Sequence, residues 1–187
     1  MSEPAKNPRG TLCAPHDPDV VRMRGRARVL LRAFNSSSEG DDDERCRILG
    51  DLLGRVGSGV IIEPPFYCDF GKNIRLGDHV FFNFNCVVLD PGEVVVGNNV
   101  LIGPGVQLYT TTHPLEFIER RRWEEHTKPI SIGDDVWIGG GTVICQGVTI
   151  GRRAVIGAGS VVTKDVPEGV LAVGNPCRVL RTIIGPG

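Results

Sequence analysis

A single histidine stands where a regular stretch of this sequence gives way to an irregular one. His113 follows the run Thr110–Thr112 and precedes Pro114, and a segment rich in charged residues comes next. An imidazole titrates near neutral pH, so a histidine at the start of an extended loop can act as a general base toward a hydroxyl group. Rigid scaffolds often present reactive residues in this way. The competing interpretation is a surface or hydrogen-bonded histidine, and other motifs must decide between the two.

The six cysteines form neither a metal-binding pattern nor a disulfide pattern. They are far apart in the sequence and none belongs to a CxxC pair, whereas zinc sites usually bring their ligands in close pairs. A secreted disulfide scaffold would be a shorter chain with denser cysteines. We therefore expect reduced thiols, mostly buried as small apolar groups, and no required metal.

The scaffold that must position His113 follows a six-residue repeat. Apolar residues recur at this interval as Ile132, Ile138, Ile144, Ile150, Ile156 and Val162. Small or β-branched residues stand four positions later as Val136, Thr142, Val148, Ala154 and Ser160. A period of six is typical of a parallel β-helix, whereas an amphipathic helix repeats at three and four residues and a half-buried strand at two. Three repeats complete one triangular turn, so residues 18 apart are predicted to stack at about 4.8 Å along the axis.

The repeat also defines where the β-helix begins and where it is interrupted. It starts loosely at about residue 57, shifts by two extra residues near Asp90–Gly92, and lapses between 109 and 129. The shift predicts a bulge at a corner, and the polar lapse predicts a loop extruded over about 110–128. Glycine follows four of the six repeating apolar residues directly. Its freedom to adopt backbone conformations that a Cβ would penalise is the expected reason.

Two helices are predicted before the repeat. Asp17 and Pro18 form an N-cap and a proline at the first helical position, and apolar residues follow at helical spacing as far as Asn35. A second helix is predicted from Asp41–Asp43, with an apolar face of Cys46, Leu49, Leu52 or Leu53, and Val56. The predicted organisation is a flexible segment 1–10, a helical appendage 11–56 and a β-helix domain 57–187. The appendage is too small for its own core and should pack on the β-helix.

Composition narrows the class of protein further. The chain has 187 residues with 41% hydrophobic residues and a net charge of −1, which suits one folded domain. Its pI of about 6.4 gives no electrostatic argument for nucleic-acid binding. No apolar run approaches the ~20 residues of a membrane span, and the N-terminus has no apolar core of a signal peptide. A cytoplasmic protein without a membrane or nucleic-acid partner is therefore expected.

Six motifs identify the family that this chain resembles. They are, in order, Glu63–Asp69 (EPPFYCD), Phe81–Asn85 (FFNFN), Thr112–Pro114 (THP), Asp135–Gly140 (DVWIGG), Ile156–Asp165 (IGAGSVVTKD) and Gly174–Arg178 (GNPCR). With them the sequence resembles the hexapeptide-repeat acyltransferases, and within these the maltose and galactoside O-acetyltransferase group, from about Leu12 to Arg181. Each motif is weak alone, but six in one order are highly specific. The helical appendage is also similar to the N-terminal segment of that group.

The resemblance implies a handedness, an assembly and an activity that the repeat alone does not. The β-helix would be left-handed, against the usual rule for crossovers, and would form a homotrimer with active sites between neighbouring prisms. The reaction would be transfer of acetyl from the co-substrate acetyl-CoA to a hydroxyl of a maltose- or glucose-like sugar or a related glycoside. His113 matches the catalytic base, which takes the proton of that hydroxyl as its oxygen attacks the thioester carbonyl.

Further residues match acceptor positions of this family. They are Asn83, Asp90, Asp17, Arg24, Asp69 and Glu125. Glu125 is expected to orient the imidazole as the acid of a catalytic triad does, with a solvated loop acid as the alternative. For Asn83 and Asp90 the alternatives are a turn-capping amide and the opening of the bulge. Pro91 replaces a second acid of the galactoside branch and Phe81 replaces an aromatic hydroxyl, which changes the expected sugar preference.

A second group of residues matches positions that line the CoA groove. They are Trp137, Gly140, Ala158, Thr163, Lys164, Arg178 and Arg181. The small residues would let the pantetheine arm lie against the prism wall, and the three cations would meet phosphates. An ordinary surface role is the alternative for the basic residues.

Two functions from other classes remain possible. Some left-handed β-helices are zinc carbonic anhydrases, which need three histidines. The sequence has only His16, His79, His113 and His126, and Ile118 stands five residues after His113. The other is a catalytically inactive trimeric scaffold or binding module, which would not need the histidine together with the matched acceptor and donor positions.

Overall fold

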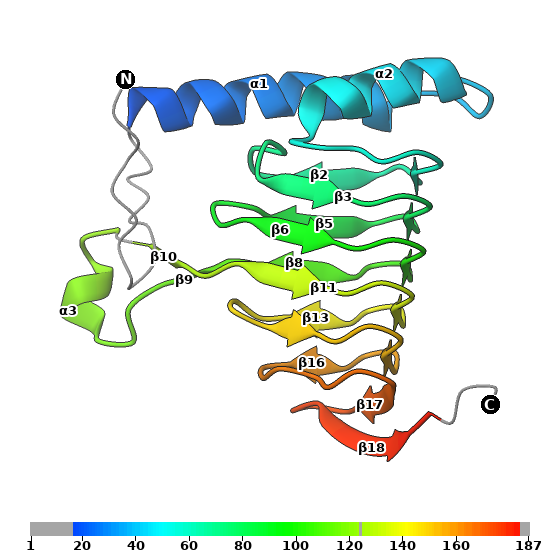
Figure 1. The fold of residues 1–187 in the computed structure, drawn as a ribbon. Coiled ribbons are helices and arrows are strands. Elements are labelled where there is room, and N and C mark those ends of the chain that lie inside the picture. The colour runs from blue at the N-terminus through cyan, green and yellow to red at the C-terminus, as the bar shows by residue number, and fades with distance from the viewer. Residues whose placement is uncertain (1–16, 124, 184–187) are drawn as a thin grey trace.

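The computed structural model describes residues 17–123 and 125–183. Two helices, α1 (Pro18–Asn35) and α2 (Asp42–Leu52), lie across one end of a column of short strands (Figure 1). The predicted flexible segment 1–10 and the first residues of the predicted appendage lie outside the described part of the chain. No helix in the described part is both long and apolar enough to cross a membrane.

The strands form the three faces of a left-handed parallel β-helix, so the predicted fold class is confirmed. The seven-stranded face contains, in order, β1 (Ile61–Ile62), β4 (Phe81–Phe82), β7 (Leu101–Ile102), β12 (Trp137–Ile138), β15 (Val155–Ile156), β17 (Val170–Val173) and β18 (Arg178–Thr182). The five-stranded face contains β2 (Phe66–Cys68), β5 (Cys86–Leu89), β8 (Gln107–Tyr109), β13 (Val143–Ile144) and β16 (Val161–Val162). The four-stranded face contains β3 (Ile74–Leu76), β6 (Val94–Val96), β11 (Ile130–Ile132) and β14 (Thr149–Ile150). Neighbouring strands within the faces are parallel, except that β18 returns antiparallel to β17.

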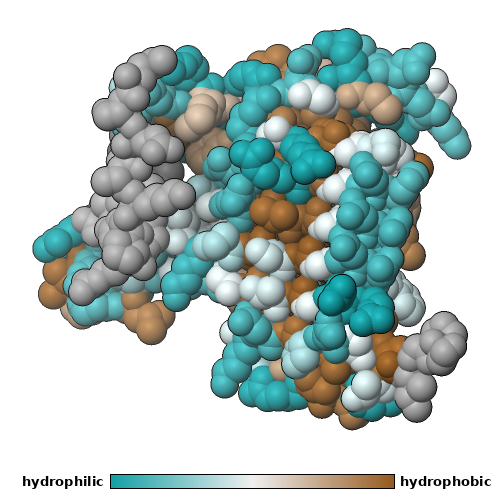
Figure 2. Space-filling model, in the orientation of Figure 1, coloured by the Kyte–Doolittle hydropathy of each residue, from teal (hydrophilic) through white to brown (hydrophobic). Residues whose placement is uncertain are grey.

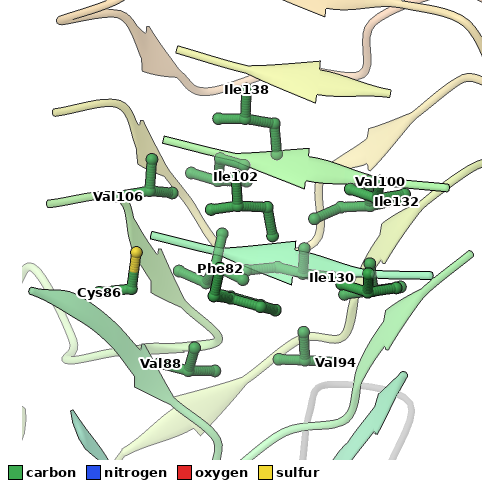
Figure 3. Packing of buried hydrophobic residues seen from close by; sticks show 14 of the residues in the cluster. Phe82, Cys86, Val88, Val94, Val100, Ile102, Val106, Ile130, Ile132 and Ile138 are labelled. Atoms are coloured by element: carbon green, nitrogen blue, oxygen red, sulfur yellow. The ribbon is translucent and has the colours of Figure 1, made fainter. Parts of the chain in front are cut away.

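The six-residue repeat fills the interior of the column. Ile132 pairs with Ile150, Ile138 with Ile156, and Ile144 with Val162, as the spacing of 18 predicts. Figure 3 shows the same stacking one turn earlier, where Phe82, Ile102 and Ile138 lie one above another. The residues four positions later are also buried, and the hydroxyl groups of Thr142 and Ser160 donate to backbone carbonyls. Both hydroxyl groups therefore have a hydrogen-bond partner although they are buried.

The glycines of the repeat serve close packing of the turns and not an unusual backbone angle. Gly133, Gly139, Gly151 and Gly157 do not have positive φ, which differs from the expected reason. A Cβ on Gly139 would lie 2.5 Å from the backbone nitrogen of Ala158, and one on Gly151 would lie 2.4 Å from that of Glu168. The next turn of the chain occupies the space that a side chain would need.

Polar side chains bridge successive turns at one corner. Asp78 Oδ1 accepts from Ser58 N (2.8 Å), Asn98 Oδ1 from Asp78 N (2.9 Å), and Asp134 Oδ1 from Asn98 N (2.7 Å). Each bond satisfies a corner amide that has no strand partner. Short acids and amides at the corners are thus part of the scaffold.

The helices cover the first turn of the β-helix. Ala27, Leu31 and Phe34 of α1 are buried, and Asn35 anchors the end of this helix by exchanging two hydrogen bonds with the backbone of Phe66. The apolar face predicted for α2 requires a correction, because Cys46 is exposed. The buried residues of α2 are Ile48, Leu49 and Leu52. Leu49 and Leu52 of the predicted face are buried as expected, and Ile48, not Cys46, joins them in the core.

Where the repeat lapses, the chain leaves the column between the five-stranded and four-stranded faces (Figure 1). A two-residue strand β9 (Thr111–Thr112) pairs antiparallel with β10 (His126–Thr127) at the base of this loop. A single helical turn, α3 (Phe117–Arg120), lies near its tip. The pairing closes the base, so the loop leaves and rejoins the column at one point.

Candidate active site

The base of the loop brings His113 and Glu125 face to face. His113 follows β9, Glu125 precedes β10, and the antiparallel pairing places the two residues opposite each other. His113 Nε2 lies 3.9 Å from Glu125 Oε1, and Thr111 Oγ1 donates to Glu125 Oε2 at 3.2 Å. At 3.9 Å the contact is too long for a hydrogen bond. The two groups form an ion pair only when the imidazole carries a second proton.

Asp69 adds a second carboxyl to this corner. Its pKa is raised to about 6, chiefly by burial and further by the negative charges of Asp90 and Glu125, while Arg24 and Arg28 act in the opposite direction. These influences show that charges from α1, the five-stranded face and the loop meet around one side chain. The arrangement is therefore a tertiary one, since its members come from three separate stretches of the chain.

Asp90 does not have the role expected for it. The residue is fully buried, Oδ1 accepts from the backbone nitrogens of Asp69 (3.0 Å) and Phe70 (2.9 Å), and Oδ2 accepts from Asn73 N (3.3 Å). Burial raises its pKa, and these hydrogen bonds oppose the rise. Asp90 holds the corner bulge together and has no exposed surface for an acceptor. These contacts agree better with the alternative role for Asp90, that of an acid that opens the bulge.

A pocket of about 750 Å³, which we call the helix pocket, lies between α1 and the five-stranded face. Its lining residues are Arg28, Leu31, Arg32, Asn35, Ser36, Tyr67, Cys68, Asp69, Val87 and Leu89. Of the predicted acceptor residues, Asp69 lines this pocket, and Arg24 acts on Asp69 electrostatically. Asp17 is the exposed N-cap of α1, where its carboxylate accepts from Asp19 N at 2.8 Å.

A groove of about 510 Å³ lies on the seven-stranded face. Three predicted donor residues, Trp137, Gly140 and Ala158, line it together with Asn83. Outward-facing apolar side chains form its floor in strict register from strand to strand: Phe81, Leu101, Trp137, Val155 and Leu171. The indole of Trp137 is 55% exposed. The groove can therefore receive an extended ligand with an apolar arm.

The remaining donor residues do not line this groove. Thr163 and Lys164 follow β16 at the end of the five-stranded face. Arg178 and Arg181 belong to β18, the last strand of the seven-stranded face, where Arg181 pairs with Leu171 of the groove.

Asn83 lies at the corner where the seven-stranded face meets the five-stranded face, between β4 and β5. His113 lies where the five-stranded face meets the four-stranded face, between β8 and β11, so in one chain the width of the five-stranded face separates the two residues. The corner with His113 and the groove with Asn83, which we call the two half-sites, are thus separate in a single chain. A site that contained both residues would need a second copy.

Part of the helix pocket is not among the residues predicted from the sequence. Arg28 and Arg32 follow Arg24 at four-residue intervals on the helix, and this spacing is the signal that points to them. Tyr67 belongs to the motif Glu63–Asp69, which by itself assigns it no role. Across residues 17–123 and 125–183, no group of three or more His, Cys, Asp or Glu side chains could hold a metal ion.

Comparisons with known proteins agree with this architecture. Residues 129–164 match the family model described as bacterial transferase hexapeptide (six repeats), and residues 12–57 match the maltose acetyltransferase hexapeptide capping motif. A putative acetyltransferase of Saccharomyces cerevisiae is 46% identical, over 91% of this chain and 87% of its own length. Galactoside O-acetyltransferase of Escherichia coli is 44% identical, over 87% of this chain and 79% of its own.

Solved structures of relatives superpose closely on the chain. A hexapeptide-repeat acetyltransferase of Vibrio cholerae, solved with acetyl-CoA, has a TM-score of 0.88 and 45% identity, covering 92% of this chain and 93% of its own. A galactoside acetyltransferase in complex with coenzyme A has a TM-score of 0.91 and 41% identity, covering 94% and 88%. The chain therefore belongs to the hexapeptide-repeat acetyltransferases, in the group of the maltose and galactoside O-acetyltransferases.

Proposed function

We propose that this protein transfers an acetyl group from acetyl-CoA to a hydroxyl of a sugar, with His113 as the general base. The observation that carries the proposal is the pairing of His113 with Glu125 at an open corner, next to Asp69 and the helix pocket. The family and the acetyl-CoA or CoA bound in two relatives support the donor.

The proposed chemistry starts from a sugar hydroxyl, which is too weakly acidic to attack a thioester unaided. His113 Nε2 takes the proton as the hydroxyl oxygen forms its bond to the acetyl carbonyl carbon. Collapse of the tetrahedral intermediate then expels the thiolate of CoA, which receives the proton from the imidazolium. A base in this role contributes about 10²- to 10⁴-fold. Glu125, held by Thr111, favours the imidazolium that forms in between.

The donor is assigned to the groove on the seven-stranded face. Gly140 and Ala158 leave room for a pantetheine arm, and the apolar floor with Trp137 offers it an extended surface. Lys164, Arg178 and Arg181 are proposed to meet the phosphates of CoA, because charge-assisted hydrogen bonds from cations are the strong ones available to phosphate oxygens.

The two half-sites support a homotrimer in which each active site joins two chains. A closed ring lets the corner with His113 of one chain meet the groove of the next, with the same contact repeated three times. The loop also exposes large apolar side chains at Leu115, Phe117, Ile118 and Trp123, and Figure 2 shows hydrophobic residues at the loop tip. Surfaces of this kind mark contacts with a partner.

The test of this function is release of free CoA from acetyl-CoA in the presence of a panel of sugars, glycosides and other alcohols. We expect CoA release that depends on the added sugar, together with a product that carries one acetyl group in its mass spectrum. A catalytically inactive scaffold would release no CoA with any member of the panel.

A further inference from the structure

Several side chains that can donate hydrogen bonds line the helix pocket. Arg28 and Arg32 lie one turn apart on α1, and Ser36 and Tyr67 add hydroxyl groups to the lining. The amide of Asn35, which also lines the pocket, is committed to the backbone of Phe66 in both directions. Apart from Asp69, the side chains that remain available for a ligand are therefore donors.

The two pocket arginines differ from other arginines on the same helix. Arg22 pairs with Asp19 at 3.0 Å, and Arg26 donates to the backbone oxygen of Asp51. Within the described residues, neither the Arg28 nor the Arg32 guanidinium makes a hydrogen bond or an ion pair. Both side chains line the pocket, and Arg28 acts electrostatically on Asp69. In the part of the chain that the structure describes, their N–H donors thus remain available for a ligand.

Acidic and basic side chains line the pocket together. Asp69 is acted on by the charges of Glu125 and Arg28, and Arg28 and Arg32 both come from α1. An anionic group of a ligand is attracted by the two guanidinium groups and repelled by the Asp69 carboxylate, so its charge favours one orientation in the pocket. Leu31, Val87 and Leu89 also line the pocket and provide an apolar surface that suits the face of a sugar ring.

We propose that the acceptor is an acidic sugar, whose carboxylate or phosphate binds Arg28 and Arg32 in the helix pocket while its reacting hydroxyl faces His113. This inference rests on the proposed function. A guanidinium group can bind a carboxylate or a phosphate through two parallel hydrogen bonds, whereas a lysine ammonium group acts as a point charge. The volume of about 750 Å³ lies within the usual range for a small-molecule site and accommodates a substituted monosaccharide.

The test compares matched ligands in the full-length protein. Methyl glucuronoside and methyl glucoside share a ring and differ in charge, and glucose 6-phosphate distinguishes a phosphate from a carboxylate. Dissociation constants without acetyl-CoA are measured by ligand-detected NMR, and kcat/KM is measured with acetyl-CoA. We expect one of the two anionic ligands to bind about 10-fold or more tightly than the neutral glycoside, and to have the higher kcat/KM.

Variants show whether the pocket arginines cause this preference. The double variant Arg28→Gln, Arg32→Gln should remove it by raising the Kd and KM of the anionic ligand. Arg22→Gln removes an arginine from the same helix outside the pocket and should leave the preference intact. An anionic preference that survives the double variant overturns the assignment.

The outcomes separate this inference from the proposed function. Binding that prefers the anion, with no acetylation of any ligand, would keep the anion subsite and refute the sugar acetyltransferase. Acetylation without any preference for an anionic ligand, or no detectable binding of any of the three, would refute the acidic acceptor.

Discussion

His113 and Glu125 are held opposite each other by backbone pairing at the base of the loop, twelve residues apart in sequence. The loop therefore does not need to be rigid along its whole length to keep the proposed base in place. Thr111, on the strand that leads to His113, fixes the carboxylate from the same side. Position and charge at this corner are thus set by three neighbouring side chains on two short strands.

Replacement of the proposed base should abolish most of the activity without loss of structure. His113→Asn is expected to lower kcat by at least about 100-fold, because proton transfer from the hydroxyl is lost. Acetyl-CoA binding, measured by calorimetry, should change little, since the donor groove does not involve this residue. His79→Asn is the matched control. It lies at a different corner with φ of 55°, which asparagine tolerates, and it should retain wild-type kcat. Activity of His113→Asn near the wild-type level would contradict the general-base assignment.

Asp69 is expected to destabilise the fold when it is ionised. Its pKa of about 6 in the folded state lies above the usual value for aspartate, so the folded state binds the proton more tightly than the unfolded state. The protein therefore loses stability as pH rises from about 4 through 6, and the full penalty is present above that range. Asp69→Asn should raise Tm at pH 7.5 by about 2–4 °C, a shift that allows for solvent screening of this partly exposed group. The gain should shrink toward zero at pH 4.

The same variant separates stability from function. If Asp69 binds the acceptor, Asp69→Asn should raise the acceptor KM even though it stabilises the fold. Thermal unfolding across pH and acceptor kinetics at pH 7.5 are the two measurements. A Tm gain of the same size at pH 4 and pH 7.5 would show that titration of this carboxyl is not the cause.

The turns of the β-helix depend on close contact between their corners, whereas the helices do not. Gly139 has no room for a Cβ because Ala158 N would lie 2.5 Å from it, and Gly25 in the exposed part of α1 has no neighbour within 4 Å. The two glycines therefore occupy opposite physical situations. At Gly139 the next turn of the chain fills the space that a side chain would need. At Gly25 that space is open, and a side chain would affect only the conformational freedom of the backbone.

Alanine substitutions at these two positions should have opposite signs. Gly139→Ala is expected to lower the free energy of unfolding by about 1–3 kcal/mol, because the next turn must shift. Gly25→Ala should raise it by about 0.5–1 kcal/mol through helix propensity alone. Chemical denaturation of both variants against the wild type measures the difference. Destabilisation by Gly25→Ala would mean that this face of α1 has a contact that the single chain does not show.

One chain carries the corner with His113 and the apolar groove with Asn83 on different sides of a three-sided column. The register of the faces is fixed by a continuous core from end to end, so no local movement brings Asn83 to His113. Apolar side chains are exposed both along the seven-stranded face and at the loop tip. Association of copies would cover both surfaces and complete the site at once.

Mixing two inactive variants tests whether each site joins two chains. His113→Asn and Asn83→Ala should each lose most activity as pure proteins. In randomly mixed trimers about three quarters contain both variants, and one site in three then combines an intact His113 with an intact Asn83. About a quarter of wild-type kcat should therefore return after co-refolding. Light scattering of the mixture checks the trimer, and no recovery in a mixed trimer would place both residues in a site within one chain.

The sequence alone determined the features that depend on local spacing. The six-residue repeat predicted which apolar residues stack, because a period of six and a triangular turn fix the partner at 18 residues. Asp17 was predictable as the N-cap of α1 because capping involves only a few consecutive residues. The motifs around His113, Trp137 and Lys164 indicate the family without any tertiary information.

Tertiary structure decided which side chains are buried, which backbone groups they bind and which residues share a pocket. Contacts between distant parts of the chain select among arrangements that the local sequence allows equally well. Cys46 and Ile48 are both apolar residues of α2, and packing buried Ile48 while it left Cys46 exposed. An aspartate at a corner can face solvent or the backbone, and the neighbouring turn took up both oxygens of Asp90. The meeting of Arg28 and Asp69 in one pocket depends on how α1 lies across the first turn. No periodicity within either segment contains that information, since it resides in the packing between them.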